Sequence, residues 1–477
     1  MISVTAYANR TVAVFGLARS GLEAVRALMA GGAEVLAFDD SEPRVAEARD
    51  QGFPVADLHA ADWSKLDALV LSPGVPLTHP NPHWTVERAR EAGVPVIGDT
   101  ELFFAERARV APDAPVVGIT GTNGKSTTTA LIGHLLLMAG RTVSVGGNIG
   151  KAVLSLEPLS PERTYVLELS SYQIDLTPTL TPSVGVLLNV TPDHLDRHGS
   201  MENYAAIKAR IGEAADKAVI AVDDDWTTGT ADRLEADGRS VTRVSATKPL
   251  DTGISVADGK VHLADHGAAT TIADLSKAPA LRGRHNAQNA AVAAAVALAL
   301  GLTTEEIAAG LASFPGLAHR MEQVGRVGKV LFVNDSKATN ADAAARSLAS
   351  FQAIHWIAGG RAKSGGIEPL RDYFSRIRRA YLIGEAAGSF AATLGDAVAH
   401  EICGDLDRAV QAAARNAERE DVTEDGAAEP VVLLAPACAS FDQFPDFEAR
   451  GEAFRDAVTR LDGFAPVAAN SETGEAA

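Results

Sequence analysis

Short apolar runs alternate with segments of helical pattern along the chain. In the first hundred residues, apolar runs at 11–15, 35–38 and 68–71 predict strands, and the segment 21–29 between the first two has the periodicity of a helix. A strand–helix–strand order of this kind predicts a parallel sheet covered by helices. A loop rich in proline and glycine follows the third run, and we predict that a first domain ends near Gly98.

The same alternation continues to the C-terminus. A strand is predicted just before Gly121, and helix patterns at 286–300 and 304–314 lead to Pro315-Gly316, which we interpret as a hinge. Further strands are predicted at 143–145, 165–169, 184–188, 218–222, 330–334, 353–358, 379–383 and 431–435. The predicted domains are 1–98, 99–316 and 317–477. Each is an α/β domain, and we expect parallel sheets with ligands at the carboxyl ends of the strands.

Composition and charge narrow the range of functions. The chain has 477 residues and a net charge of −18, which argues against a nucleic-acid or anionic-membrane surface, so we expect neither partner. Its two cysteines, Cys403 and Cys438, predict no disulfide framework and fit a reducing compartment. Arg10, Gly16 and Arg19 interrupt the apolar N-terminal run, which argues against a signal peptide. We therefore expect a cytoplasmic protein.

The segment Gly121-Thr122-Asn123-Gly124-Lys125-Ser126 lies between a predicted strand and a predicted helix that starts at Thr127. A glycine loop in this place points backbone N–H groups at one spot, where the helix N-terminus adds positive potential, and this arrangement binds phosphate. Lys125 is expected to reach the β- and γ-phosphates, and the Ser126 hydroxyl to bind Mg²⁺. Strict P-loop spacing puts a glycine at position 119, where this chain has Ile119. The alternative is an ordinary glycine turn capped by Ser126.

A second glycine turn, at 16–21, follows the first strand, and Asp39 follows the second. This is the order of a dinucleotide fold, and it leaves open an NAD site, a site for another nucleotide, or a structural turn. The middle position of the glycine fingerprint is Ala18, whose Cβ would crowd a pyrophosphate.

Polar residues follow two strands of the central segment. Glu168 lies at the end of one strand, before Ser170-Ser171, and Asn189 ends another, followed by a loop that contains His194. A carboxylate and an imidazole beside a P-loop are suited to Mg²⁺. The alternatives are an ion pair or a helix cap for Glu168 and a helix-terminal or core histidine for His194. Lys208, in a predicted helix, is by itself expected to be a surface lysine.

Further polar groups stand near the hinge and in the third segment. Asn286 and Asn289 are one helical turn apart and suit an adenine-sized ligand, although Asn286 alone is also a plausible cap. His319-Arg320 follows the hinge, and 334–340 follows a strand, with Lys337 placed to stabilise negative charge on a transferred group. The loops at 359–363 and 436–442 end two more strands; turn chemistry is the alternative, and Cys438 is expected to be a buried structural thiol.

Together these motifs resemble the Mur ligase family over essentially the whole chain. The resemblance rests on Gly121–Ser126, on Asn189–Asp196, on Arg284-His285-Asn286 and on His319-Arg320. Within the family, 334–339, 436–447 and 146–150 are similar to the member that adds D-glutamate. The resemblance implies an α/β fold of three domains: a Rossmann-like N-terminal domain, a P-loop-type central ATPase domain and a Rossmann-like C-terminal domain. These would bind UDP-sugar, ATP and amino acid in that order.

The resemblance also implies the reaction. ATP would phosphorylate the terminal carboxylate of UDP-N-acetylmuramoyl-L-alanine, and the amine of D-glutamate would attack the acyl phosphate to give an amide and phosphate, in peptidoglycan precursor synthesis. By this resemblance Ser126 and Glu168 would hold a first Mg²⁺, and His194 and a carbamylated Lys208 a second. Lys125, Lys208, His194 and Lys337 would be catalytic.

The binding roles are likewise carried over from the family. The nucleotide would contact Gly121, Thr122, Asn123, Gly124, Lys125, Ser126, Thr127, Asn286, Asn289, His319, Arg320 and Asp335. The UDP-linked substrate would contact Arg19, Ser20, Asp39, Ser72, Gly74, Asn148 and Ser171, and D-glutamate would contact Lys337, Thr339, Lys363, Ser440 and Phe447. Asp40, Ser41 and Arg361 depart from the pattern, so an arginine contact to UDP is missing and the loop before Lys363 lacks an acid.

Rival functions of other classes stay open at this point. A nicotinamide-dependent dehydrogenase would leave the P-loop unexplained, and a non-catalytic ATP-binding regulator would bind ATP without substrate-dependent phosphate release. A folylpolyglutamate synthase also adds glutamate, but the opening strand–helix–strand domain argues against it. We expect a monomer.

Overall fold

The computed structural model describes residues 1–362, 365–420 and 428–466. By its internal contacts it divides into two units. The first unit is Met1–Lys277 with Asn286–Ala312, and the second is Ala278–His285 with Ser313–Ala477. Each unit is described by itself. The predicted domain boundaries at 98 and 316 stay predictions.

The first unit begins with a parallel sheet of four strands in the order β2-β1-β3-β4. Its strands are β1 (Thr11–Phe15), β2 (Glu34–Phe38), β3 (Ala68–Leu71) and β4 (Val96–Ile97), and its helices are α1 (Arg19–Ala30), α2 (Glu42–Asp50) and α3 (Trp84–Ala92). The three apolar runs of the first hundred residues therefore form strands at the predicted places.

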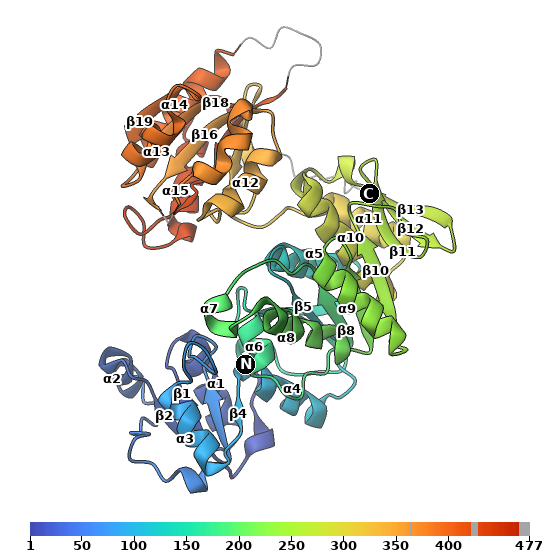
Figure 1. Ribbon diagram of the computed structural model, residues 1–477, viewed down its shortest axis with the longest axis vertical. Helices are drawn as coiled ribbons and strands as arrows, with labels where there is room; N and C mark the ends of the chain where they lie inside the picture. The colour runs from blue at the N-terminus through green and yellow to red at the C-terminus, as the bar shows by residue number, and fades with distance from the viewer. Residues whose placement is uncertain (363–364, 421–427, 467–477) are drawn as a thin grey trace, which may run out of the picture. The chain divides into compact units, whose positions relative to one another are not determined.

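The larger sheet of this unit has nine strands in the order β13-β12-β11-β10-β9-β8-β5-β7-β6. Its strands are β5 (Val116–Thr120), β6 (Thr142–Gly147), β7 (Arg163–Glu168), β8 (Val184–Leu187), β9 (Lys217–Ala221), β10 (Val241–Ser245), β11 (Gly253–Ala257), β12 (Lys260–Asp265) and β13 (Ala268–Asp274). Its helices are α4 (Asp99–Val110), α5 (Lys125–Met138), α6 (Ser171–Asp175), α7 (Leu195–His198), α8 (Met201–Glu213), α9 (Asp225–Ala236), α10 (Arg284–Ala299) and α11 (Thr304–Ser313). The chain order of these elements is followed by colour in Figure 1.

The prediction of a purely parallel sheet is wrong at one end of this sheet. Strands β11 and β12, and β12 and β13, pair antiparallel. They are joined by Asp258-Gly259 and by His266-Gly267, with φ between +47° and +83° at these four residues. Two-residue turns with positive φ form hairpins, and a parallel connection needs a much longer crossover.

The second unit holds a sheet of seven strands in the order β19-β18-β16-β20-β15-β14-β22. Its strands are β14 (Glu322–Val327), β15 (Val330–Asn334), β16 (Ala353–Gly359), β18 (Ile377–Ile383), β19 (His400–Gly404), β20 (Pro430–Leu434) and β22 (Phe464–Pro466). A short ladder pairs β17 (Arg361–Ala362) with β21 (Cys438–Ala439), and the helices are α12 (Ala341–Ala349), α13 (Ala387–Leu394), α14 (Leu406–Glu418) and α15 (Phe447–Thr459). Here too the expected parallel order fails at one edge, where β14 and β22 run antiparallel.

The buried strands place the glycine loop. Every residue of β5 is buried, so the strand is covered on both faces. Its two edges pair with β7 and β8. Helix α5 then returns over β6 at Gly133, where a Cβ would lie 2.5 Å from Cγ2 of Val145. A glycine at this point lets the helix approach the strand closely.

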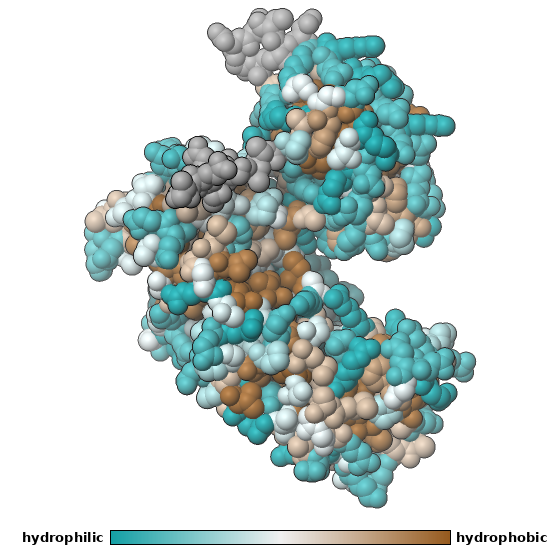
Figure 2. All heavy atoms as spheres, turned by 180° about the vertical axis from the view of Figure 1, so that it is seen from behind, coloured by the Kyte–Doolittle hydropathy of each residue, from teal (hydrophilic) through white to brown (hydrophobic). Residues whose placement is uncertain are grey.

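The surface is largely polar. Hydrophilic side chains cover much of the face seen in Figure 2, with apolar side chains in patches between them. Leu137 and Met138, at the end of α5, are among the large apolar side chains that stay exposed. Within the described ranges, no helix has both the length and the apolar character needed to cross a membrane.

Candidate active site

The loop between β5 and α5 has the form that the sequence predicts. Gly121 and Gly124 adopt φ of +155° and +82°, and a Cβ at Gly124 would lie 2.5 Å from Oδ1 of Asn289. The ammonium group of Lys125, the first residue of α5, donates to the carbonyls of Gly121 and Thr122, at 3.0 Å each. The lysine is therefore folded over the loop whose N–H groups would receive phosphate.

Asn189 holds this loop from the neighbouring strand. Its Oδ1 accepts from the backbone N–H of Asn123 at 2.8 Å, and its Nδ2 donates to the Asn123 carbonyl at 3.1 Å. The hydroxyl of Thr122 donates to the carbonyl of Thr191, at 3.1 Å, and lies 3.2 Å from the Tyr204 hydroxyl. The sequence placed Asn189 at a strand end but assigned it no role, because its pairing with the loop depends on the order of strands in the sheet.

Asn286 and Asn289 lie together beneath the same loop. Both are buried on α10, and Nδ2 of Asn289 donates to Oδ1 of Asn286 at 3.2 Å. Asn289 also accepts from the hydroxyl of Thr128, at 3.1 Å, in the first turns of α5. The structure thus brings the two predicted asparagines to the glycine loop. Ser126 is buried in the first turn of α5, and Thr127 follows it.

Lys208 is not a surface residue. It is 1% exposed on α8, and its Nζ donates to the Gly121 carbonyl at 2.8 Å and to the Thr120 hydroxyl at 3.2 Å. Burial, reinforced by the nearby charge of Lys125, holds the pKa of Lys208 well below its ordinary value. Interpreting Lys208 from the residues alone as a surface lysine is therefore wrong, because tertiary packing places the side chain behind the glycine loop.

Glu168 is a buried carboxylate with an open oxygen. It is 2% exposed at the end of β7, and Oε1 accepts from Nδ2 of Asn148 at 2.9 Å. Its Oε2 is buried and has no hydrogen-bond partner in the part of the chain described. A buried carboxylate oxygen in this state fits a cation, since such an atom otherwise carries a large desolvation cost.

The histidines of the next loop differ in burial. The side chain of His194 is 45% exposed and lies 5.0 Å from the Tyr172 ring. His198 is 2% exposed, and its Nε2 lies 2.9 Å from the hydroxyl of Ser171, while Nδ1 has no partner among the described residues. Burial, with the charges of His194 and Lys208, lowers the pKa of His198 to about 4. Sequence reasoning missed His198; its only signal was a second histidine four residues after the first.

The predicted Mg²⁺ ligands are side chains of four different chemical types. Across residues 1–362, 365–420 and 428–466, no group of three or more His, Cys, Asp or Glu side chains is placed to hold a metal ion. The predicted set combines a hydroxyl, a carboxylate, an imidazole and a lysine, and the open Oε2 of Glu168 fits it.

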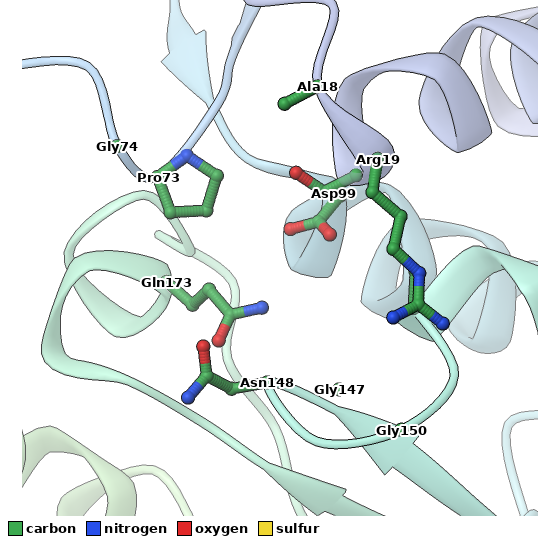
Figure 3. A pocket seen from close by; sticks show the side chains of 11 residues that line it. Ala18, Arg19, Pro73, Gly74, Asp99, Gly147, Asn148, Gly150 and Gln173 are labelled. Atoms are coloured by element: carbon green, nitrogen blue, oxygen red, sulfur yellow. The ribbon is translucent and has the colours of Figure 1, made fainter. Parts of the chain in front are cut away.

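A cavity of about 310 Å³ lies between the two sheets of the first unit. Its lining includes Arg19, Ser20 and Gly74 from the small sheet and Asn148 from the large one, as Figure 3 shows for the labelled side chains. Arg197 joins the two parts, because its guanidinium donates to the carbonyls of Gly74 and Val75 at 2.9 and 2.8 Å. Four of the predicted substrate residues therefore share one cavity.

Asp39 and Ser72 support the first glycine turn. The Asp39 carboxylate accepts from the backbone N–H groups of Leu17 and Ser41, at 2.7 and 2.8 Å. The Ser72 hydroxyl donates to the carbonyl of Gly16 at 2.7 Å. These bonds hold the turn that opens α1.

Two contacts near this turn involve the region of Asp40 and Ser41, which depart from the family pattern. Arg44, on α2, reaches the Asp39 carboxylate at 3.4 Å with its side chain 53% exposed. Asp40 instead lies 3.0 Å from Nε2 of His83 and accepts from the Trp84 indole at 3.2 Å.

In the second unit, His319 and Asn334 form a buried pair. Nδ1 of His319 lies 3.0 Å from Nδ2 of Asn334, and the His319 carbonyl accepts from the backbone N–H of Lys337 at 3.1 Å. The ammonium group of Lys337 lies 3.7 Å from the centre of the Phe447 ring. The structure thus gathers three predicted residues, His319, Lys337 and Phe447, at the carboxyl end of β15.

Asp335 is buried next to this pair. It accepts from the Ser347 hydroxyl and from the backbone N–H of Met321, the latter at 3.3 Å. Burial raises the pKa of Asp335 to about 6, against the opposing charge of Arg320. Asp335 and Arg320 are therefore electrostatically coupled, as two groups of the predicted nucleotide site.

Arg450 braces the loops that carry Thr339 and Ser440. Its buried guanidinium donates to the Ser336 hydroxyl and carbonyl, at 3.0 and 2.8 Å, and to the Cys438 carbonyl at 3.1 Å. The role of Arg450 could not be predicted from the sequence, because a single arginine in a helix pattern does not indicate that its side chain is buried.

The remaining predictions for this unit concern Cys438, Arg361 and Lys363. Burial raises the pKa of Cys438 to about 12, so this thiol is held neutral, as expected for a structural cysteine. Arg361 lies at the surface, paired with Glu385 at 3.1 Å. Lys363 lies outside the described residues.

Comparison with known proteins decides the family. A model of the Mur ligase middle domain matches residues 119–297, and one of the Mur ligase, glutamate ligase domain matches 319–437. UDP-N-acetylmuramoylalanine–D-glutamate ligase of Nitrobacter hamburgensis is 60% identical over 98% of this chain and 100% of its own. The protein of the same name from Brucella abortus is 57% identical over 99% and 100%. The chain belongs to the Mur ligase family.

Solved structures agree on the fold of this Mur ligase. UDP-N-acetylmuramate–alanine ligase MurC of Thermotoga maritima covers 94% of this chain and 99% of its own, with a TM-score of 0.56 and 18% identity. A pseudomurein peptide ligase type C of Methanothermus fervidus covers the same shares, with a TM-score of 0.53 and 18% identity. At this identity the likeness concerns the fold alone.

Proposed function

We propose that this Mur ligase joins D-glutamate to UDP-N-acetylmuramoyl-L-alanine, with ATP as the second substrate, through an acyl phosphate. The observation that carries the proposal is the cavity of about 310 Å³, whose lining includes Asn148. Asn148 donates to the buried carboxylate of Glu168, in the same unit as the glycine loop, so the cavity extends toward the groups that would bind the phosphates. The relatives that match nearly their whole length are named for this reaction.

The residues of the central domain would handle the phosphoryl group. The N–H groups of the glycine loop would receive the phosphates of ATP, and Lys125 would turn from the carbonyls of Gly121 and Thr122 to the β- and γ-phosphates. The carboxylate of the UDP-linked substrate would lie at Asn148. Its oxygen attacks the γ-phosphorus, the bond to the β-phosphate oxygen breaks, and ADP leaves.

The amide then forms at the same carbon. The uncharged amine of D-glutamate attacks the acyl phosphate, loses a proton and displaces phosphate. Splitting the reaction in this way replaces a poor leaving group with a good one. Lys337, packed against Phe447, would stabilise negative charge in this step, with Thr339, Ser440 and Phe447 around the amino acid.

Mg²⁺ would be held by this chain's own donors. Ser126 and Glu168, whose Oε2 has no partner among the described residues, would hold the first ion, and His194 and Lys208 would hold the second. When bound, the ions supply positive charge that lowers the cost of bringing two anions together.

Lys208 requires a modification for that role. An ammonium group cannot bind Mg²⁺, but its neutral amine can add to CO₂, losing a proton and giving a carbamate with two oxygen ligands. The depressed pKa of Lys208, caused by burial, favours the neutral amine on which carbamylation depends.

The nucleotide and UDP sites complete the assignment. Asn286 and Asn289 would frame the adenine side of ATP, and the nucleotide contacts assigned to His319, Arg320 and Asp335 rest on the family resemblance alone. Arg19, Ser20, Asp39, Ser72, Gly74 and Ser171 would line the path of the UDP-linked substrate. Arg44, whose exposed side chain lies beside Asp39, would contact UDP in place of the arginine that the family pattern has at position 41.

The test is phosphate release by the full-length protein. We expect release from ATP to need both UDP-N-acetylmuramoyl-L-alanine and D-glutamate, with L-glutamate far less active. Release without the UDP-linked substrate would contradict the acyl-phosphate route, and equal activity with L-glutamate would contradict the amino-acid assignment. ATP binding without any release would favour a non-catalytic regulator.

The proposal also includes the oligomeric state and the cellular location. We expect the active form to be a monomer in the cytoplasm. Size-exclusion chromatography with light scattering would reveal a larger assembly, and cell fractionation would reveal another location.

A further inference from the structure

Asp99 is a buried carboxyl group that the roles above do not use. It is the first residue of α4, is 4% exposed, and lines the cavity of about 310 Å³. Its Oδ1 accepts from the backbone N–H of Thr100 at 2.9 Å and from the Thr100 hydroxyl at 3.4 Å. Both of these bonds are accepted by Oδ1.

Gln173 holds Asp99 from the opposite wall. Its Oε1 accepts from the backbone N–H and the hydroxyl of Ser170, at 3.1 and 3.2 Å, in the capping box of α6. With that oxygen engaged, the amide NH₂ is the group left to donate, and the Gln173 side chain hydrogen-bonds the Asp99 carboxyl. Each carboxyl oxygen has two lone pairs, so after the bonds from Thr100 and Gln173 the Asp99 carboxyl can still accept from a ligand in the cavity.

The position of Asp99 along the cavity suggests what it meets. In Figure 3 it lies between Arg19, at the start of α1, and Gln173, with Asn148 beyond. This step rests on the proposed function: UDP-N-acetylmuramoyl-L-alanine is a linear molecule with its nucleotide at one end and its reacting carboxylate at the other. With UDP at Arg19 and the carboxylate at Asn148, the amino sugar falls beside Asp99.

We propose that Asp99 accepts a hydrogen bond from the amino sugar of the UDP-linked substrate, from its acetamido N–H or a ring hydroxyl, and thereby selects for that sugar. A buried acceptor discriminates strongly, because a ligand that lacks the matching donor leaves it unpaired. The phosphates of the substrate carry no hydrogen-bond donor for Asp99 to accept from. The contribution of Asp99 to binding should therefore be confined to the sugar.

The test compares Asp99→Asn with the unaltered protein by calorimetry. An amide presents a donor where the carboxyl presents two acceptors, so either the Thr100 N–H or the sugar loses its partner in each flip state. We expect the dissociation constant for UDP-N-acetylmuramoyl-L-alanine to rise at least about tenfold and that for UDP to change less than about twofold. The KM for ATP should stay unchanged.

Glu101→Gln is the matched control. Glu101 is a buried carboxylate on the same helix, but it bonds the backbone N–H and hydroxyl of Thr179, at 2.9 and 2.7 Å, and is not among the cavity-lining residues. We expect this variant to lower the melting temperature and to leave both dissociation constants unchanged. If Asp99→Asn does not fold, Asp99→Ser keeps an oxygen for the Thr100 N–H and should show the same loss.

The outcomes separate this inference from the proposed function. If the unaltered protein does not bind UDP-N-acetylmuramoyl-L-alanine, the proposed function fails. If it binds and Asp99→Asn binds equally well, or loses UDP to the same extent, the role of Asp99 in sugar recognition is wrong. UDP-N-acetylglucosamine and UDP-glucose then identify the donor: loss confined to the first indicates the acetamido group, and equal loss indicates a hydroxyl.

Discussion

The carboxyl ends of the central sheet and of the C-terminal sheet are built differently. At the central edge, Lys208, Glu168 and His198 are buried titratable groups, and two of their atoms, Oε2 of Glu168 and Nδ1 of His198, have no partner among the described residues. At the other edge, Asn334 bonds a histidine, a glutamate and a backbone carbonyl, and Arg450 joins two loops, although its buried Nη1 has no partner among the described residues. The first edge therefore leaves an acidic oxygen and an imidazole nitrogen for ligands, whereas the second leaves one nitrogen of a guanidinium whose other nitrogens are bonded within its own unit.

The largest expected effect is at the central edge. We expect Lys125→Ala to lower kcat by about 10³-fold or more, because its charge would stabilise the transferring phosphoryl group. The side chain is only partly buried, so the melting temperature should change little. Steady-state kinetics with thermal unfolding checks both.

Lys65→Ala is the control for that variant. Its side chain is 79% exposed, beside Asp62. It should leave kcat unchanged, and near-normal turnover in Lys125→Ala would refute the phosphate role.

Lys208→Ala tests the buried amine. We expect a loss of about 10²-fold in kcat, since one ligand of a cation is removed, and partial recovery with acetate, which fills the gap with a carboxylate. Lys217→Ala is the matched control, because this lysine is exposed at β9 and donates only to the Ala299 carbonyl, at 3.1 Å, in the bonds described. Full activity of Lys208→Ala, or no recovery with any short carboxylate, would return Lys208 to a structural role.

The two edges should respond to pH with opposite sign. The pKa of His198 is lowered by burial from 6.5 to about 4, so between these values the unfolded chain binds more protons and stability falls as pH drops. The pKa of Asp335 is raised by burial from 3.8 to about 6, so the folded chain binds more protons in that range and stability falls as pH rises.

Substituting one of the two residues should remove its contribution to the pH dependence of stability and leave the other contribution in place. Above pH 6, Asp335→Asn should stabilise the second unit by about 2 kcal/mol, and below pH 4 His198→Gln should relieve a cost of similar size in the first. Hydrogen exchange of peptides from each unit, measured from pH 4 to 7, reports the two separately. Slopes of the same sign in both units would contradict the assignment.

The smallest effect is expected at Arg361. Its pair with Glu385 joins two side chains that are each more than half exposed, and such pairs contribute about 0–1 kcal/mol. We expect Arg361→Ala to change the KM for D-glutamate less than about twofold. A larger change would give this residue a substrate role that its exposed position does not suggest.

Local patterns predicted much of this molecule. The strand at 330–334, the glycine loop at 121–126 and the placement of Asn286 and Asn289 one helical turn apart depend on neighbours in sequence, and each was predicted. The burial of Lys208 was not, because the residues alone say only that it lies on a helix. Its position behind the loop depends on how α8 packs on β5, which is set by distant parts of the chain.

Other misses share that cause. The hairpins of β11–β13 carry turn residues in the sequence, but the alternation of strands and helices before them favoured a parallel sheet. Arg450 and Asn189 act by bridging loops that only the sheet order brings together.

The close approach of α5 to β6 has a consequence for how this sequence can change over generations. A methyl group at position 133 would collide with the Val145 side chain, which is branched at Cβ and has little freedom to move away. We therefore expect Gly133→Ala to destabilise the protein while Val145 is present, and to be better tolerated after Val145→Ala, which removes the Cγ2 atom that the new methyl group would meet. The order in which the two mutations arise thus affects their cost, and a genetic screen for suppressors of Gly133→Ala should return substitutions at position 145.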